Sequence, residues 1–174
     1  MQKYFFFGIK SAITTVFLVF VCNLSFSQSL QIGKVQVGGN FGFDITNNIL
    51  VIDIAPVLGT SPIKNTTLSV SPFFSYAQDL SQPNNRLTRC GLRAAVQYSI
   101  YAGLFAHAEY ELSFVYLNRQ FQGVYHALPI GLGFEQLIAP NTVAYAAVLY
   151  NVIHSQSDFV QSPFQYRVGV RHAF

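Results

Sequence analysis

The chain ends with the stretch Phe164-Gln-Tyr-Arg-Val-Gly-Val-Arg-His-Ala-Phe174, whose side chains alternate between two kinds. One face carries the mainly apolar set Phe164, Tyr166, Val168, Val170, His172 and Phe174. The other face carries the mainly polar set Gln165, Arg167, Gly169, Arg171 and Ala173. Successive side chains of a β-strand point to opposite faces, so this period of two predicts a strand between an apolar and a polar environment.

The same alternation recurs through the rest of the chain, in segments near the roughly 9–11 residues that a tilted strand needs to cross a bilayer. Eight segments span residues 34–45, 49–58, 67–76, 87–98, 102–113, 124–136, 142–151 and 164–174. No Asp, Glu, Lys or Arg falls on the positions that we assign as outward. In the segment 142–151 these outward positions are Val143, Tyr145, Ala147 and Leu149. An empty outward face is expected in lipid, where a charge at the midplane costs about 2–4 kcal/mol.

The charged residues gather on the inward face. They are Lys34, Asp44, Asp53, Arg89, Arg93, Glu109, Glu111, Glu135, Arg167 and Arg171. A soluble lipocalin-like barrel has the opposite arrangement, with an apolar inside and a charged outside. We therefore predict an all-β fold, an eight-stranded antiparallel up-and-down transmembrane barrel with a polar, charge-paired interior.

The composition agrees with a single membrane-embedded domain. The chain has 174 residues, 10% of them charged and 16% aromatic, whereas soluble domains carry about 25% charged residues. Eight Lys and Arg and seven Asp and Glu follow residue 27. This near balance gives no reason to expect a nucleic-acid partner.

The first 27 residues have the pattern of a signal peptide. Lys3 and Lys10 precede the apolar stretch 12–21, and Ser25-Phe-Ser27 supplies small residues at a cleavage site. We predict cleavage before Gln28, which leaves a barrel domain over residues 28–174. The alternative is an uncleaved anchor helix, but the apolar stretch has about half of the roughly 20 residues that a membrane span needs. Cys90 is the one cysteine after the cleavage site, so no intrachain disulfide is expected.

The connections between segments predict which barrel end faces which side. Short turns at 99–101 and 138–141 are expected at the periplasmic end, and longer loops at 77–86, 115–123 and 152–163 at the other end. The connection 61–66 is longer than a typical periplasmic turn. Proline has no N–H for a sheet ladder, so we expect β-bulges at Pro56, Pro72 and Pro129.

The inward charges are expected to pair with one another. A three-residue turn at 99–101 places Arg89 opposite Glu111 and Arg93 opposite His107. The first hairpin places Asp53 opposite a glycine, Gly42. The predicted network comprises Arg89, Arg93, Glu109, Glu111, Asp53, Glu135, Arg167 and Arg171. Such a network is either a plug of salt bridges or the lining of a proton or ion path.

No motif for catalysis, cofactor binding or metal binding stands out. His154, Ser155 and Asp158 have the residue types of an acyl-transfer site, but a polar loop supplies these types by chance. His107 has no second ligand at metal-binding spacing. Gly38-Gly39 and Gly42 lie within a strand, not at the strand-to-helix turn that binds phosphate. We therefore predict no catalytic residues, no cofactor and no metal.

Taken together, these features resemble the small Gram-negative outer-membrane barrels of the OmpA/OmpX type. The resemblance is carried by the signal peptide, the eight strands, the charged interior, the closing segment Tyr166–Phe174, and Leu128-Pro-Ile-Gly-Leu-Gly-Phe134 followed by Val148-Leu-Tyr-Asn151. It implies a monomer of the cell outer membrane, with outer-membrane lipid and the barrel-assembly machinery as partners. Tyr166, Val168, Val170, His172 and Phe174 would be the assembly signal. Since the last strand ends at Phe174, we expect no periplasmic peptidoglycan-binding domain of the OmpA branch.

Members of this broad group include adhesins, enzymes and small-solute conduits, so the resemblance does not identify one activity. We expect a structural or surface-interaction role through the extracellular loops, with a partner that the sequence does not identify. The alternatives are a lipid A-modifying acyl hydrolase or transferase that uses the last loop, and a narrow small-solute conduit.

Overall fold

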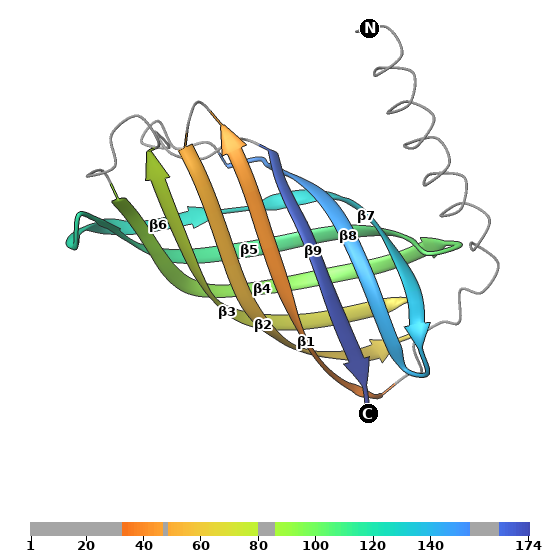
Figure 1. The fold of residues 1–174 in the computed structure, drawn as a ribbon. Coiled ribbons are helices and arrows are strands. Elements are labelled where there is room, and N and C mark those ends of the chain that lie inside the picture. The colour runs from red at the N-terminus through yellow and green to blue at the C-terminus, as the bar shows by residue number, and fades with distance from the viewer. Residues whose placement is uncertain (1–32, 47–48, 80–85, 154–163) are drawn as a thin grey trace, which may run out of the picture.

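The computed structural model describes residues 33–46, 49–79, 86–153 and 164–174, which are built almost wholly of β-strands (Figure 1). The strands are β1 (Val35–Thr46), β2 (Ile49–Ile63), β3 (Thr66–Asp79), β4 (Arg86–Tyr101), β5 (Leu104–Leu117), β6 (Gln120–Ala127), β7 (Pro129–Ala139), β8 (Thr142–Asn151) and β9 (Phe164–Ala173). Among the described residues, no helix is long and apolar enough to span a membrane.

The strands close into one antiparallel barrel. Neighbouring strands follow the order β4-β3-β2-β1-β9-β8-β7-β5, and pairing between β4 and β5 closes the ring. Both β6 and β7 pair with β5, β6 along Glu111–Leu117 and β7 along Leu104–Ala108. They therefore share one position in the wall, and the barrel has the eight strands that the sequence predicts.

The predicted bulges at the prolines are wrong, because the ladders are interrupted there without a change of register. Between β2 and β3, the pairs Ile54–Phe74 and Leu58–Val70 flank a stretch without pairing that contains Pro56 and Pro72. Pro129 marks the break between β6 and β7, on either side of which the register with β5 is the same. The missing N–H groups open the ladder locally, and neighbouring pairs hold the strands in place.

Three short turns lie at the barrel end that also holds the start of β1 and the end of β9, here called the short-turn end (Figure 1). They are Lys64–Asn65, Ala102–Gly103 and Pro140–Asn141. Asn65, Ala102, Gly103 and Asn141 have positive φ, which tight hairpin turns require. The connection after β2 is therefore shorter than the sequence predicts, because β2 continues to Ile63 and β3 begins at Thr66.

At the opposite end, the prediction of a loop over residues 115–123 is wrong. These residues form the tip of a β5–β6 hairpin with the two-residue turn Asn118–Arg119, whose φ values are 49° and 69°. Positive φ at both central residues matches the twist of the two strands. The predicted loops 77–86 and 152–163 lie mostly outside the described residues.

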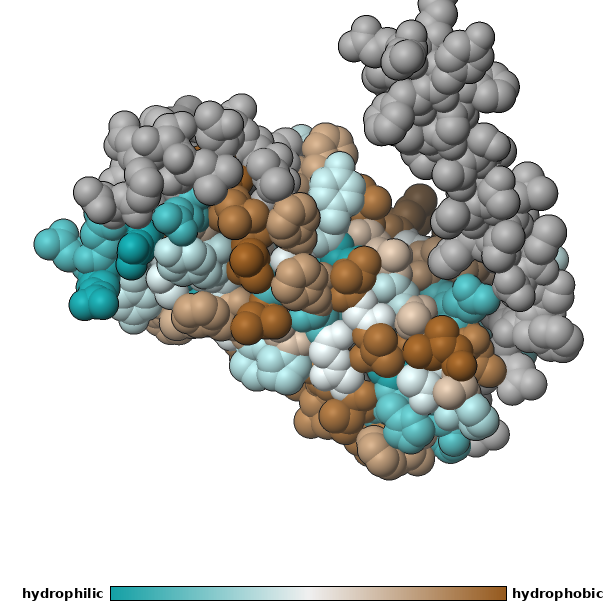
Figure 2. All heavy atoms as spheres, in the orientation of Figure 1, coloured by the Kyte–Doolittle hydropathy of each residue, from teal (hydrophilic) through white to brown (hydrophobic). Residues whose placement is uncertain are grey.

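The outer wall is apolar, as the alternation predicts (Figure 2). Leu58, Leu132 and Val168 each remain more than half exposed. The prediction is wrong for β8, where Val143, Ala147 and Leu149 are buried in the lumen and Tyr145 packs against them. The register explains this: Val143 lies opposite Arg171 and Ala147 opposite Arg167, and residues directly opposite share a face. A bulge between Leu137 and Ala139 sets this register.

Candidate functional site: the charged lumen

The lumen is the candidate site, because five strands direct all eight residues of the predicted charge network into it. Asp53 comes from β2, Arg89 and Arg93 from β4, and Glu109 and Glu111 from β5. Glu135 of β7 and the two arginines of β9, Arg167 and Arg171, complete it. Four arginines face four carboxylates, so their formal charges cancel inside the barrel.

Arg93 is the centre of the network. Its Nη1 and Nη2 atoms donate to the two carboxylate oxygens of Asp53 at 2.7 and 2.6 Å. Its Nε donates to Glu111 Oε2 at 2.9 Å, and its guanidinium lies over the Phe73 ring, 3.7 Å from the centroid. Paired hydrogen bonds of this kind fix both partners in one geometry, so Arg93 joins β2, β3 and β5 through β4.

Glu111 is fully buried and accepts from two arginines. Arg89 and Arg93 both bind its carboxylate. The predicted register was wrong: Arg93 lies opposite Glu111, and Arg89 lies opposite Val115. The turn is the residue pair Ala102–Gly103, with an irregularity between Ser99 and Tyr101, and this shifts every pair between β4 and β5.

Glu109 links β5 to the last strand. Arg167 Nη2 lies 2.9 Å from Glu109 Oε1, and His107 Nε2 lies 3.4 Å from Oε2. Asp53 lies opposite Gly42, as predicted, and its carboxylate binds Arg93. The ion pairs therefore connect strands that are far apart in sequence.

Arg171 and Glu135 form the part of the network nearest the short-turn end. Arg171 Nη2 donates to Glu135 Oε2 at 2.8 Å, and Gln97 Nε2 donates to the same oxygen at 2.8 Å. Ser99 Oγ donates to Glu135 Oε1 at 3.1 Å. The guanidinium of Arg171 also lies 4.8 Å from the centroid of the Tyr145 ring.

Sequence reasoning missed the apolar part of the lumen. Phe105, Ala147 and Leu149 are buried together, and Tyr145 packs against them. The Tyr145 hydroxyl donates to Asn40 Oδ1. Gly169 is the sequence feature that could have indicated this apolar part. It lies opposite Tyr145, and because glycine has no side chain it leaves room for the Tyr145 ring.

A small cavity lies among these side chains. An enclosed cavity of about 20 Å³ lies between the charged and the apolar parts, bordered by Asn40, Gln97, His107 and Tyr145. This is room for about one water molecule. The described residues contain no cluster of three side chains suited to a metal ion. His154, Ser155 and Asp158 lie outside the described residues.

The residues predicted as an assembly signal lie along β9. Tyr166, Val168 and Val170 are exposed on the outer wall, and Phe174 is 71% exposed. His172 is half-buried, with Nδ1 2.9 Å from Thr142 Oγ1 and its ring packed edge-on against Phe174. The N–H of Phe174 donates to the carbonyl of Val35 at 2.9 Å.

No protein-family model matches the chain, and a search of curated proteins finds no match. Several solved structures resemble it. The outer membrane protein Ail of Yersinia pestis has a TM-score of 0.55 and 11% identity, over 82% of this chain and 99% of that one. Neisserial surface protein A has a TM-score of 0.53 and 16% identity, over 81% of this chain and 96% of that one. OprG from Pseudomonas aeruginosa has a TM-score of 0.52 and 11% identity, over 83% of this chain and 97% of that one.

At these identities, the likeness shows the fold alone. The chain has the fold of eight-stranded outer-membrane barrels, which confirms the predicted architecture.

Proposed function

We propose that the protein is a monomeric outer-membrane barrel with a plugged lumen, and that it binds a partner outside the cell through its β5–β6 hairpin. The single observation that carries this proposal is the edge of β6. Within the described residues, β6 pairs with β5 and with no other strand. Among the described strands, its second edge therefore leaves backbone N–H and C=O groups for pairing with another chain.

The hairpin has the composition of a surface that binds in water. It projects at the barrel end opposite the short turns, where hydrophilic side chains gather (Figures 1 and 2). Asn118, Arg119, Gln120 and Gln122 are exposed around its turn, together with Phe121. Polar groups around an aromatic residue are a common arrangement at protein interfaces.

The lumen supports a binding role over a conduit. Arg93 and Glu111 are buried in mutual ion pairs, and the enclosed cavity in the described lumen has room for about one water molecule. A conduit for solutes needs a continuous wet path. We infer that the ion pairs hold the barrel rigid beneath the hairpin.

Photocrosslinking from the surface of intact cells tests this proposal. A photoreactive amino acid at Gln122 should form adducts with extracellular proteins, and the same amino acid at Lys64, at the short-turn end, should form none. Replacing residues 116–121 by an Asn-Gly turn should abolish the adducts from Gln122. Equal yields from the two positions, or binding that survives the shortened hairpin, would contradict the proposal.

The enzyme alternative rests on residues outside the described part of the chain. Incubating the refolded protein with labelled lipid A and reading the products by mass spectrometry tests it directly. Deacylated or acylated products that disappear in His154→Ala would replace the binding role by a lipid-modifying one.

We also propose that the barrel-assembly machinery reads the outward row of β9 that ends at Phe174. Deleting Phe174 should leave unfolded protein in the periplasm, because the row then lacks its terminal aromatic side chain. Heat-modifiable mobility in outer-membrane fractions measures folding. A deletion strain with a normal amount of folded protein would show that Phe174 is not part of the signal.

A further inference from the structure

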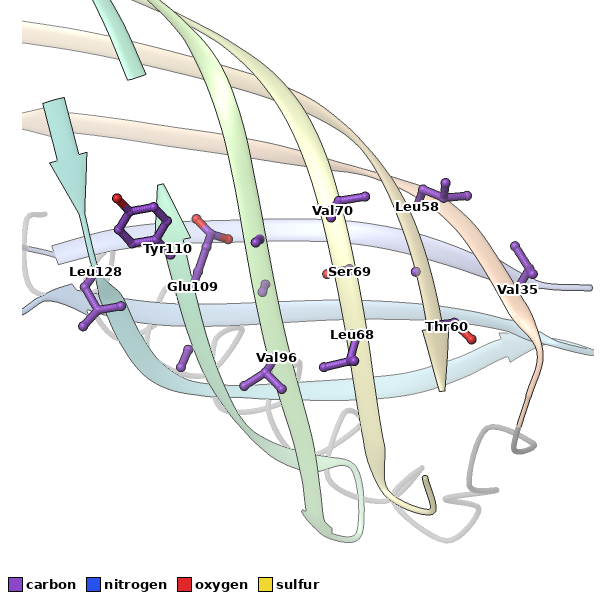
Figure 3. A pocket seen from close by; sticks show the side chains of 14 residues that line it. Val35, Leu58, Thr60, Leu68, Ser69, Val70, Val96, Glu109, Tyr110 and Leu128 are labelled. Carbon is purple, nitrogen blue, oxygen red and sulfur yellow. The ribbon is translucent and has the colours of Figure 1, made fainter. Parts of the chain in front are cut away.

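A groove on the outer wall is the strongest site outside the lumen. It has a volume of about 710 Å³ and crosses strands β2 to β5 (Figure 3). Its sides are formed by Leu58, Leu68, Val70, Val96, Tyr110 and Leu128. Sites for small molecules span roughly 300–1,000 Å³, so the groove is large enough to hold part of a lipid molecule.

The groove exists because small residues interrupt two rows of large outward side chains. In one row Ala94 stands between Val70 and Tyr110, its partners on β3 and β5. In the next row, nearer the short-turn end, Ala108 lies opposite Val96. The two alanines line the groove as its floor, and larger residues such as Val70, Val96 and Tyr110 border it.

The polarity of the groove changes along its length. Its middle is apolar, and at the short-turn end Thr60 contributes a hydroxyl between Val35 and Leu68. An acyl chain fits the apolar middle, where buried polar groups would lack partners. A hydroxyl at one end suits the ester or phosphate oxygens of a lipid.

Two lysines lie beyond this end of the groove. Lys34 directly precedes Val35, and Lys64 is exposed in the turn between β2 and β3. The N–H of Gly33 donates to the carbonyl of Ser61 at 2.8 Å, which holds the Lys34 segment beside the end of β2. The other charged side chains of the described short-turn end, Glu135 and Arg171, point into the lumen and bind each other. The exposed side chain of Lys64 therefore places a positive charge beyond this end of the groove.

We propose that this groove binds one anionic phospholipid, with an acyl chain over Ala94 and Ala108 and the phosphate on the side of Lys64. Charge complementarity selects the headgroup, and the apolar lining of the groove suits an acyl chain. The lipid would be held at one position of the wall, unlike the exchanging lipids around the rest of the barrel.

Native mass spectrometry of the refolded full chain tests this site, with phosphatidylglycerol and phosphatidylcholine as probes. The wild-type protein should retain one phosphatidylglycerol. Ala94→Leu with Ala108→Leu fills the floor and should weaken retention at least tenfold. The matched control is Ala144→Leu with Ala146→Leu, which adds the same side chains to the outward face of β8 and should leave retention unchanged.

The headgroup is tested separately. Lys64→Gln should weaken the preference for phosphatidylglycerol over phosphatidylcholine, and Arg119→Gln at the opposite end should preserve it. Heat-modifiable mobility establishes that each variant is folded before binding is compared. Two results would overturn the site: no lipid retained by the wild-type protein, or equal loss in the groove variant and the β8 control. A preference unchanged by Lys64→Gln would overturn the role of the headgroup.

Discussion

The inner walls of β4–β5 and of β8 face the same lumen with opposite chemistry. The first carries Arg89, Arg93, Glu109 and Glu111 in a network of ion pairs. The second carries Val143, Tyr145, Ala147 and Leu149, and the last three pack with Phe105 of β5, which β7 separates from β8. Polar and apolar packing therefore fill two parts of one barrel interior, so a lumen-facing position need not be polar.

The two regions are stabilised by different interactions. In the ionic part, each buried charge depends on a partner from another strand, because a charge without one is costly in a low-dielectric interior. In the apolar part, shape and volume decide stability. Substitutions in the two regions should therefore lower the free energy of unfolding for different reasons.

The largest effect is expected at Glu111, the fully buried carboxylate that accepts from two arginines. Glu111→Met takes one carboxylate from Arg89 and Arg93 and should lower the free energy of unfolding by about 3–5 kcal/mol. Urea titration of the protein refolded in lipid vesicles measures this loss.

A double-mutant cycle separates ion pairing from packing at this position. Arg89→Met alone should also destabilise the barrel, while Arg89→Met with Glu111→Met should recover much of the loss. A coupling energy near zero, together with conductance in planar bilayers, would mean that the charges line a wet path and not a plug.

The next effect concerns the two sides of the wall. Leu132 is exposed on the outer face of β7, and Leu132→Arg should cost about 2–4 kcal/mol because it places a charge in lipid. Ala127→Ser, inside the lumen beside Glu111, should be nearly silent, since a hydroxyl there has polar neighbours. Equal effects of the two substitutions in the same titration would contradict the assignment of faces.

The sequence predicts the barrel well because most of its strands are polar on one face only. In β9, Arg167 and Arg171 alternate with Val168 and Val170, and lipid tolerates only the second pair outside. Both faces of β8 are apolar, with Val143 and Leu149 on one and Val148 and Tyr150 on the other. Alternation therefore does not distinguish the inner from the outer face of β8. The bulge after Leu137 determines which face points into the lumen.

The site was predictable as a set of residues and not as a set of contacts. Strand parity alone places Arg89, Arg93, Glu109 and Glu111 inside. Their partners depend on the register between β4 and β5. The turn lies at Ala102–Gly103 instead of 99–101, so each residue of β4 pairs four positions further along β5 than predicted. Arg93 binds Asp53, a residue two strands away, and no local pattern in the sequence indicates such a contact.

The apolar part gives a smaller effect than the ionic part. Leu149 is fully buried, and Leu149→Ala should lower the free energy of unfolding by about 2–3 kcal/mol through lost packing. Its neighbour Val148 points outward, so Val148→Ala should change stability by less than about 1 kcal/mol. The reverse order in the vesicle titration would restore the face assignment that the sequence favours.

The smallest effect is expected at the hydroxyl of Tyr145, which crosses from the apolar wall to Asn40 of β1. Tyr145→Phe keeps the ring against Phe105 and Gly169 and removes a single donor, so it should cost about 1 kcal/mol. Tyr166→Phe is the matched control, because that side chain lies on the outer wall of β9. If both tyrosine variants unfold at the wild-type urea concentration, the Tyr145–Asn40 bond adds nothing to stability. The ion pairs would then be the main polar link between the strands that line the lumen.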